Sequence, residues 1–204
     1  MISEQDRANL GTFMGRYALQ HTRIYPHPIE RVWRAVTDAK ELSAWYVPEW
    51  TVDPRLGGAW SFSYGNPTLE ALEGFEQGFG HGVITAWEPP RLVDYGGEHR
   101  FELTRVEGGT RLDWTQTIDP ARRFPLLEER VIADWKTRHA EDWENPGGPG
   151  YPVTAGGQAG NHWAMDDLGA ILDGRTPRPF DDRAYYKALT DAYDDHFRRN
   201  MPGA

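Results

Sequence analysis

His162 and Asp166 are the first side chains in this 204-residue chain whose types and spacing suggest chemistry. Four residues apart on a helix, an imidazole and a carboxylate lie on one face, as a metal site or an acid–base pair requires. A catalytic zinc site needs at least three protein ligands, and the sequence holds no HExxH motif and no cysteine. The stripe of this helix that we expect to face the sheet lies about 100° round from the pair and comprises Asn161, Met165, Leu168 and Leu172. We therefore expect the pair at the rim, solvated or hydrogen-bonded, and expect no metal and no cofactor.

His81 is the other candidate, because it stands between two glycines in a run with strand-like alternation, "GFGHGVITAWEPP". That alternation puts Phe79, His81 and Val83 on one face, which is aromatic in the neighbouring strands. The flanking glycines leave room for a ligand or a second backbone. Two interpretations follow: a buried histidine bonded to a neighbour, or a general acid–base, with Tyr64 assisting.

The composition excludes several classes of protein. Aromatic residues make up 13% of the chain, including nine tryptophans, so we expect a packed core. A net charge of -9 argues against binding to nucleic acid or to an anionic membrane surface. No apolar run approaches the ~20 residues of a membrane span, and the first residues lack the apolar stretch of a signal peptide. Together with the absence of cysteine, this predicts a cytoplasmic protein.

The order of predicted elements begins with a polar arm, 1–16, which forms a short helix or a loose segment. A strand follows in "RYALQHTRIYPHP", then helices in "PIERVWRAVTD" and "AKELSAWYV". From residue 49 to residue 118 the period is two, with Gly- and Pro-containing turns, which indicates an antiparallel meander with one aromatic face.

The second half of the chain is predicted to be largely helical. We expect a helix in "PLLEERVIADWKTRHAEDW", a loop in "ENPGGPGYPVTAGGQAG", a helix over 161–173 and a last amphipathic helix. The apolar face of that last helix contains Tyr186, Leu189, Tyr193 and Phe197.

Several of these segments together resemble a known superfamily. They are "IYPHPIERVWRAVTDAKELSAWYVPEW", "LGGAWSF", "GVITAWEPPRLVDY", "GGTRLDWTQTI" and "AGNHWAMDDLGAILDG". The chain is similar here to the START-like (SRPBCC, Bet v 1-type) superfamily, in the branch related to the activator of the heat-shock-protein ATPase. The resemblance implies an α+β helix-grip fold, in which a curved antiparallel sheet wraps around a long C-terminal helix. We expect this domain over 17–174, with a helical insertion at about 120–158 and a C-terminal extension over 175–204.

Two positions depart from the pattern of the resembling family. Gly160–Asn161 stands where relatives usually carry Gly-Trp, so Asn161 either caps the helix or adds an amide at the mouth of a cavity. Gln116 stands where many relatives carry histidine. Because an amide does not titrate near neutral pH, Gln116 can orient a ligand but cannot move a proton, which argues against an enzyme.

We therefore predict a binding protein that holds a hydrophobic or aromatic small molecule between the sheet and the C-terminal helix. The expected ligand-binding residues are Trp60, Phe62, Tyr64, Phe79, His81, Phe101, Trp114, Gln116, Asn161 and Met165. Two other functions stay open. One is a cofactor-free enzyme of the polyketide cyclase or dehydratase type that uses His81, and the other is an interaction module like the co-chaperone. The insertion is either a lid or, through Trp135 and Trp143, the surface of a homodimer.

Overall fold

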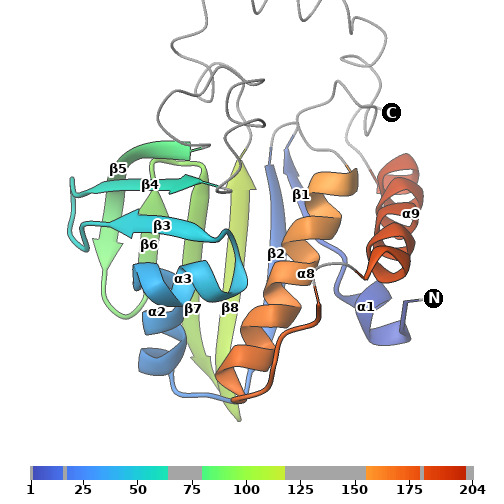
Figure 1. Cartoon of the computed structure of the whole chain (residues 1–204), viewed down its shortest axis with the longest axis horizontal. Helices are drawn as coiled ribbons and strands as arrows, with labels where there is room; N and C mark the ends of the chain where they lie inside the picture. The colour runs from blue at the N-terminus through green and yellow to red at the C-terminus, as the bar shows by residue number, and fades with distance from the viewer. Residues whose placement is uncertain (1, 16–17, 64–79, 118–154, 180–181, 201–204) are drawn as a thin grey trace, which may run out of the picture. The chain divides into compact units, whose positions relative to one another are not determined.

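The computed structural model describes residues 2–15, 18–63, 80–117, 155–179 and 182–200 (Figure 1). Its elements are α1 (Glu4–Ala8), β1 (Thr12–Gly15), β2 (Ala18–Tyr25), α2 (Ile29–Thr37), α3 (Ala39–Trp45), β3 (Glu49–Val52), β4 (Ala59–Ser63), β5 (Gly80–Glu88), β6 (Leu92–Tyr95), β7 (His99–Val106), β8 (Gly109–Thr117), α8 (Ala155–Leu172) and α9 (Arg183–Asn200). Tyr64, Phe79, the helix expected in 125–143 and both tryptophans proposed for a dimer surface lie outside the described residues.

The eight strands form one sheet in the order β1-β2-β8-β7-β6-β5-β4-β3. With a long helix after the last strand, this α+β architecture is the helix-grip fold that the sequence predicts. The chain divides into two compact units: unit 1 contains Met1–His21, Gln116–Trp163 and Pro179–Ala204, and unit 2 contains Thr22–Thr115 and Ala164–Arg178. No helix within the described ranges has both the length and the apolar character that crossing a membrane requires.

Unit 2 is a meander of strands with two short helices on one face (Figure 1). Pro28 stands directly before α2, where the backbone N–H that proline lacks is not needed for a helical hydrogen bond. The Asp38 carboxylate accepts the backbone N–H of Glu41 and so caps α3. The buried faces of both helices pack with the sheet and with the second half of α8 in one apolar core. Its α8 members are Ala164, Met165, Leu168 and Leu172, three of which belong to the predicted stripe.

Unit 1 forms around α9 and the first half of α8, which pack alongside each other (Figure 1). The segment expected to be an arm contains α1 and β1. A capping box between Ser3 and Asp6 starts α1, and β1 pairs with β2 at the edge of the sheet. The apolar core of unit 1 comprises Ile2, Leu19, Ala155, Ala159, Trp163, Tyr185, Leu189, Ala192, Tyr193 and Phe197. Tyr185 is therefore the buried tyrosine at the start of α9, whereas the predicted Tyr186 is 41% exposed.

The glycine-rich end of the predicted loop is helical, which corrects the prediction for 155–160. α8 begins at Ala155, six residues before the predicted start. A helical glycine costs roughly 1 kcal/mol relative to alanine, but Ala155 and Ala159 are buried in the core of unit 1. At Gly156 the small residue lets α9 approach, because the Tyr186 hydroxyl donates to its carbonyl at 3.0 Å. Packing therefore outweighs the poor helix propensity of this segment.

Candidate functional site

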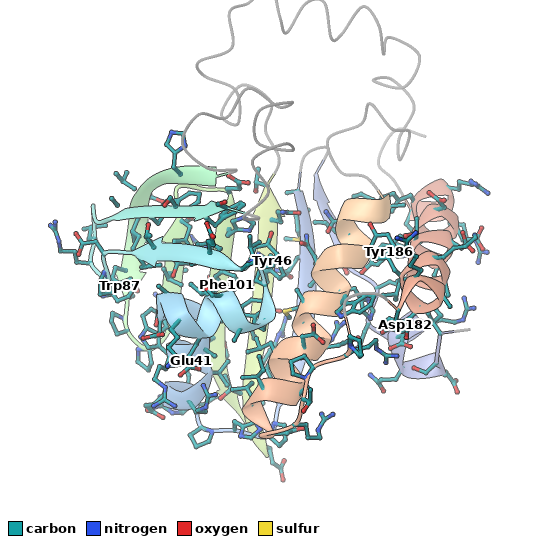
Figure 2. All side chains as sticks on the ribbon, viewed as in Figure 1. Glu41, Tyr46, Trp87, Phe101, Asp182 and Tyr186 are labelled. Atoms are coloured by element: carbon teal, nitrogen blue, oxygen red, sulfur yellow. The ribbon has the colours of Figure 1, made fainter. Side chains whose placement is uncertain are left out.

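The core of unit 2 contains a continuous group of rings, which we call the aromatic cluster. Its members are Trp45, Tyr46, Trp50, Trp60, Phe62, Tyr95, His99, Phe101 and Trp114. Trp50 lies 5.0 Å from Phe62 and 6.0 Å from Trp60 between ring centroids. Figure 2 labels Tyr46 and Phe101 within this group, and Tyr46 lies 5.0 Å from Trp114. The period-two strands supply most of these rings, as predicted.

The buried polar atoms of the cluster fall into two groups. The indole N–H of Trp45 donates to the Ala35 carbonyl at 2.9 Å, and the Tyr95 hydroxyl donates to the Val36 carbonyl at 2.9 Å. In contrast, the indole nitrogens of Trp50 and Trp60 are buried and have no hydrogen-bond partner among the described residues. The large majority of buried side-chain polar atoms in proteins have a hydrogen-bond partner. The two neighbouring indole N–H groups without an acceptor therefore make Trp50 and Trp60 the part of the cluster where a ligand acceptor is most expected.

Gly80 and Gly82 are required by the rings of the cluster. A Cβ atom at Gly80 would lie 2.4 Å from the Phe62 ring, and one at Gly82 would lie 3.1 Å from the indole nitrogen of Trp60. The space beside these glycines is therefore filled by protein side chains, whereas the sequence suggested room for a ligand.

His81 lies on the opposite face of β5, so its predicted place on the aromatic face is wrong. It pairs across the sheet with Ser61, while Trp60 and Phe62 pair with the two glycines. Since side chains alternate along a strand, the imidazole points away from the cluster, and it is exposed. The two glycines, and not His81, face the rings. The structure gives no support to His81 as an acid–base residue in this core.

Two buried tyrosines of unit 2 bind backbone carbonyls. The Tyr25 hydroxyl donates to the Met165 carbonyl at 2.7 Å, which ties β2 to the second half of α8. Burial raises the pKa of Tyr25 far above its usual value; nearby Arg23 acts to lower this pKa and Asp166 to raise it. Burial alone raises the pKa of Tyr95 in the same direction. Both hydroxyls therefore stay protonated at neutral pH.

Unit 1 holds a network of three buried side-chain amides. Gln116 Oε1 accepts from Gln158 Nε2 at 3.0 Å and from Asn161 Nδ2 at 2.6 Å. Asn161 Nδ2 also donates to Gln158 Oε1 at 3.3 Å, and His21 Nε2 lies 2.9 Å from the same oxygen. Because a carbonyl oxygen only accepts, Nε2 of His21 carries a hydrogen. Gln116 and Asn161, the two positions that depart from the family pattern, are thus joined by a hydrogen bond between their side chains.

Asn161 lies inside α8 and does not cap it, so that alternative is wrong; the helix begins six residues earlier. Both hydrogens of its amide nitrogen are used within the network, whereas its Oδ1 atom has no bond to any described residue. The Nε2 atom of Gln116 likewise makes no bond to a described residue. The two side chains are 4% and 8% exposed.

His162 is fully buried, so its predicted place at the rim of the helix is wrong. Its Nδ1 atom lies 3.2 Å from the Tyr193 hydroxyl of α9, which also accepts the backbone N–H of Gly11 at 3.2 Å. The same hydroxyl lies 3.4 Å from Nδ1 of His21. α9 thus covers a face of α8 that the sequence suggested to be open. Asp166, in unit 2, pairs with Arg23 at 3.4 Å and stays partly exposed, as expected of a rim residue.

The structure therefore separates the predicted ligand-binding residues into groups. Trp60, Phe62, Phe101, Trp114 and Met165 lie in the core of unit 2, and Gln116 and Asn161 lie in unit 1. The list of predicted residues omits Trp50, His21 and Gln158. The alternation of Trp50 with Glu49 and Thr51 in β3 could have shown that Trp50 is buried. No local pattern could have shown that His21 and Gln158 meet, because only the fold brings them together.

Comparison with known proteins agrees with this architecture. The sequence model described as "Activator of Hsp90 ATPase homolog 1-like protein" matches residues 26–145, more than half of the chain. The chain belongs to this family. We call this family AHSA-type; it is a branch of the superfamily that the sequence motifs resemble, so that prediction is confirmed. A search of curated protein sequences found no match to this AHSA-type chain.

Three solved structures share the fold of this AHSA-type protein. EF2215 from Enterococcus faecalis, a conserved protein of unknown function, has a TM-score of 0.58 at 12% identity, covering 97% of this chain and 96% of its own. CalU16 from Micromonospora echinospora has a TM-score of 0.51 at 19% identity, with coverage of 87% and 86%. The protein encoded by BPP1335 from Bordetella parapertussis has a TM-score of 0.50 at 20% identity, with coverage of 95% and 91%. At these identities the likeness concerns the fold alone.

Proposed function

We propose that this AHSA-type protein binds a small molecule with a hydrophobic or aromatic body and a hydrogen-bond acceptor. The observation that carries the proposal is the pair of buried indole N–H groups of Trp50 and Trp60. An unsatisfied buried donor costs about 1–3 kcal/mol, and two such donors lie on rings 6.0 Å apart. An acceptor brought by a bound molecule would remove both costs.

The surroundings of the two indoles suit such a molecule. Rings of the aromatic cluster offer apolar area and edge-to-face contacts, which favour flat or apolar ligands. The donors of Trp45, Tyr95 and Trp114 already have protein acceptors. A ligand oxygen would therefore be recognised at Trp50 and Trp60 rather than elsewhere in the cluster.

The family also makes a co-chaperone-like interaction module the second candidate. Such a module needs a large exposed apolar patch. The exposed large apolar side chains of the described residues are few, and no two share an element or turn: Met14, Ile24, Leu56, Val83 and Tyr186. This observation favours the small-molecule proposal.

The test is native mass spectrometry of the purified protein, which detects a retained small molecule by its mass. Trp50→Phe and Trp60→Phe keep an apolar ring and remove the donor, so both should lower the retained fraction. The matched control is Trp87→Phe, since Trp87 is partly buried in unit 2 and makes an edge-to-face contact with Trp33 at 5.2 Å between ring centroids. If no mass is retained, or if all three variants retain it equally, the proposal fails. Capture of a chaperone with no bound molecule would favour the second candidate.

A further inference from the structure

Unit 1 contains two fully buried histidines, His21 and His162, that the proposed function does not use. We propose that His162 is a pH-sensitive switch, which attaches the N-terminal helix α1 more firmly to the first half of α8 when its imidazole takes up a second proton. The groups that operate this switch belong to unit 1, and the switch needs no bound ligand.

Three nitrogen atoms lie around the Tyr193 hydroxyl and determine where its hydrogen points. The Gly11 N–H donates to the hydroxyl at 3.2 Å, while Nδ1 of His162 lies at 3.2 Å and Nδ1 of His21 at 3.4 Å. A hydroxyl has one hydrogen and two lone pairs. Because Gly11 takes one lone pair, one imidazole nitrogen has to donate to the hydroxyl and the other has to accept from it.

The amide of Gln158 decides between the two imidazoles. Its Nε2 atom donates to Gln116 Oε1 at 3.0 Å, so its Oε1 atom is the one that lies 2.9 Å from Nε2 of His21. A neutral His21 therefore carries its hydrogen on Nε2 and accepts from Tyr193 at Nδ1. His162 consequently carries its hydrogen on Nδ1, which leaves a lone pair on Nε2.

The Nε2 atom of His162 faces a carboxylate of α1. It lies 3.9 Å from Oδ1 of Asp6, which also accepts the Tyr185 hydroxyl at 3.4 Å. With a neutral imidazole, an acceptor thus faces an acceptor, beyond hydrogen-bond distance. A proton added to Nε2 turns this contact into an ion pair between α1 and α8, and it breaks no bond of the network.

His21 offers no comparable place for the proton. A second hydrogen on His21 would have to sit on Nδ1, and the Tyr193 hydroxyl would then face three donors with only two lone pairs. Protonation of His162 keeps the number of donors around this hydroxyl unchanged. The network therefore directs the proton to His162.

The charges around His162 also favour the second proton. An imidazolium without a counter-charge would be costly at a fully buried position, but the Asp6 carboxylate makes the protonated pair neutral. Asp166, four residues later in α8, is paired with Arg23 at 3.4 Å. The described titratable groups that β2 and α9 place beside the pair are uncharged: His21, Tyr185 and Tyr193.

The effect of pH on α1 follows by linkage. The protonated imidazole meets Asp6 only while α1 lies against α8, so the docked helix binds the proton more tightly than the undocked one. Docking of α1 is therefore strengthened as the pH falls through the range in which histidines titrate, and this contribution is lost as the pH rises above that range.

The experiment measures amide hydrogen exchange of the full chain by NMR at about pH 5.5 and about pH 7.5, on the two sides of the usual histidine range. The reporters are the amides of Arg7 and Asn9, which donate to the carbonyls of Ser3 and Gln5. After correction for the intrinsic exchange rate at each pH, their protection should be roughly threefold or more higher at the lower pH.

The informative variant is Asp6→Asn, which keeps an oxygen for the Ser3 N–H and removes the charge, so the difference between the two pH values should vanish. The matched control is Asp191→Asn, the same substitution at an exposed residue of α9, which should keep the difference. An equal protection at both pH values, or an unchanged difference in Asp6→Asn, would overturn the proposal.

A second measurement covers the case in which Asp6→Asn loses α1 altogether. The ring nitrogen shifts of His162 in the wild-type protein should show a hydrogen on Nδ1 alone at the higher pH and on both nitrogens at the lower pH. A hydrogen on Nε2 at the higher pH, or an imidazole that stays neutral at the lower pH, would overturn the proposal without any variant.

Discussion

The hydroxyl of Tyr193 on α9 lies 3.2 Å from Nδ1 of His162 on α8, and both side chains are fully buried. With a neutral imidazole, His21 presents the lone pair of Nδ1 to this hydroxyl, because its Nε2 hydrogen points to Gln158. Tyr193 then donates to His21 and accepts from His162. A single hydroxyl thus joins α9 to a strand and to a helix of unit 1.

Removing this hydroxyl should weaken unit 1. Tyr193→Phe takes away the acceptor of the Gly11 N–H and the partner of His162, so we expect the free energy of unfolding to fall by about 1–3 kcal/mol. Chemical denaturation followed by circular dichroism measures the loss. Tyr186→Phe, on the same helix but with an exposed hydroxyl, should change stability by less than about 0.5 kcal/mol. Equal effects of the two substitutions would contradict the assigned role.

Two glycine-to-alanine substitutions should have opposite effects. In Gly80→Ala the new methyl group would lie 2.4 Å from the Phe62 ring, and such overpacking costs about 1–3 kcal/mol. In Gly160→Ala the methyl group meets no described atom within 4 Å, and alanine favours a helix by roughly 0.5–1 kcal/mol. Thermal unfolding should therefore show a lower midpoint for the first variant and a higher one for the second. A stabilised Gly80→Ala protein would mean that Phe62 does not rest on this strand.

Alkaline pH should destabilise the folded protein through two tyrosines. Burial raises the folded-state pKa of Tyr25 and Tyr95 above the unfolded value of about 10. Their contribution is complete below that unfolded value, and it is lost as the pH rises from there toward the folded-state pKa, because only the unfolded state releases its protons. Unfolding free energies measured across this range should decline less steeply in the double variant Tyr25→Phe/Tyr95→Phe. An identical slope would show that the two hydroxyls ionise in place.

Substitution of His81 should have little consequence. His81→Ala removes an exposed side chain from the face of β5 that the aromatic rings do not occupy. We expect a change of less than about 0.5 kcal/mol in unfolding free energy and an unchanged affinity for any ligand that native mass spectrometry reveals. A large loss of affinity would restore His81 to the binding site.

The elements governed by local pattern could be predicted from the sequence. α2, α3 and the strands follow from helical or alternating spacing of apolar residues, and Trp60 and Phe62 alternate with serines in β4. His81 was assigned to the wrong face because the smallest residues of β5, Gly80 and Gly82, face the core and carry no hydrophobic signal. A periodic pattern is recognised from hydrophobic side chains, and the inward positions at this end of β5 are glycines, which have no side chain.

The remaining differences come from contacts between distant segments. Nothing near Ala155 in the sequence indicates a helix, since its stability comes from packing in the core of unit 1. Likewise His162 is buried by α9, which follows it by about twenty residues. Gln116 and Asn161 could be named from the family comparison, but the bond between them depends on Gln158, which the sequence assigned to a loop.

Because both amide hydrogens of Asn161 are donated within the network, spontaneous deamidation at this residue would damage unit 1. Deamidation of Asn161 to aspartate would replace the Nδ2 atom with an oxygen facing the carbonyl oxygens of Gln116 and Gln158. The new oxygen would then face two carbonyl oxygens at a nearly buried position, with no hydrogen between it and either of them. A single hydrolysed bond would thus remove the central donor of the network, and such a lesion at this one asparagine is a chemical defect that refolding cannot repair.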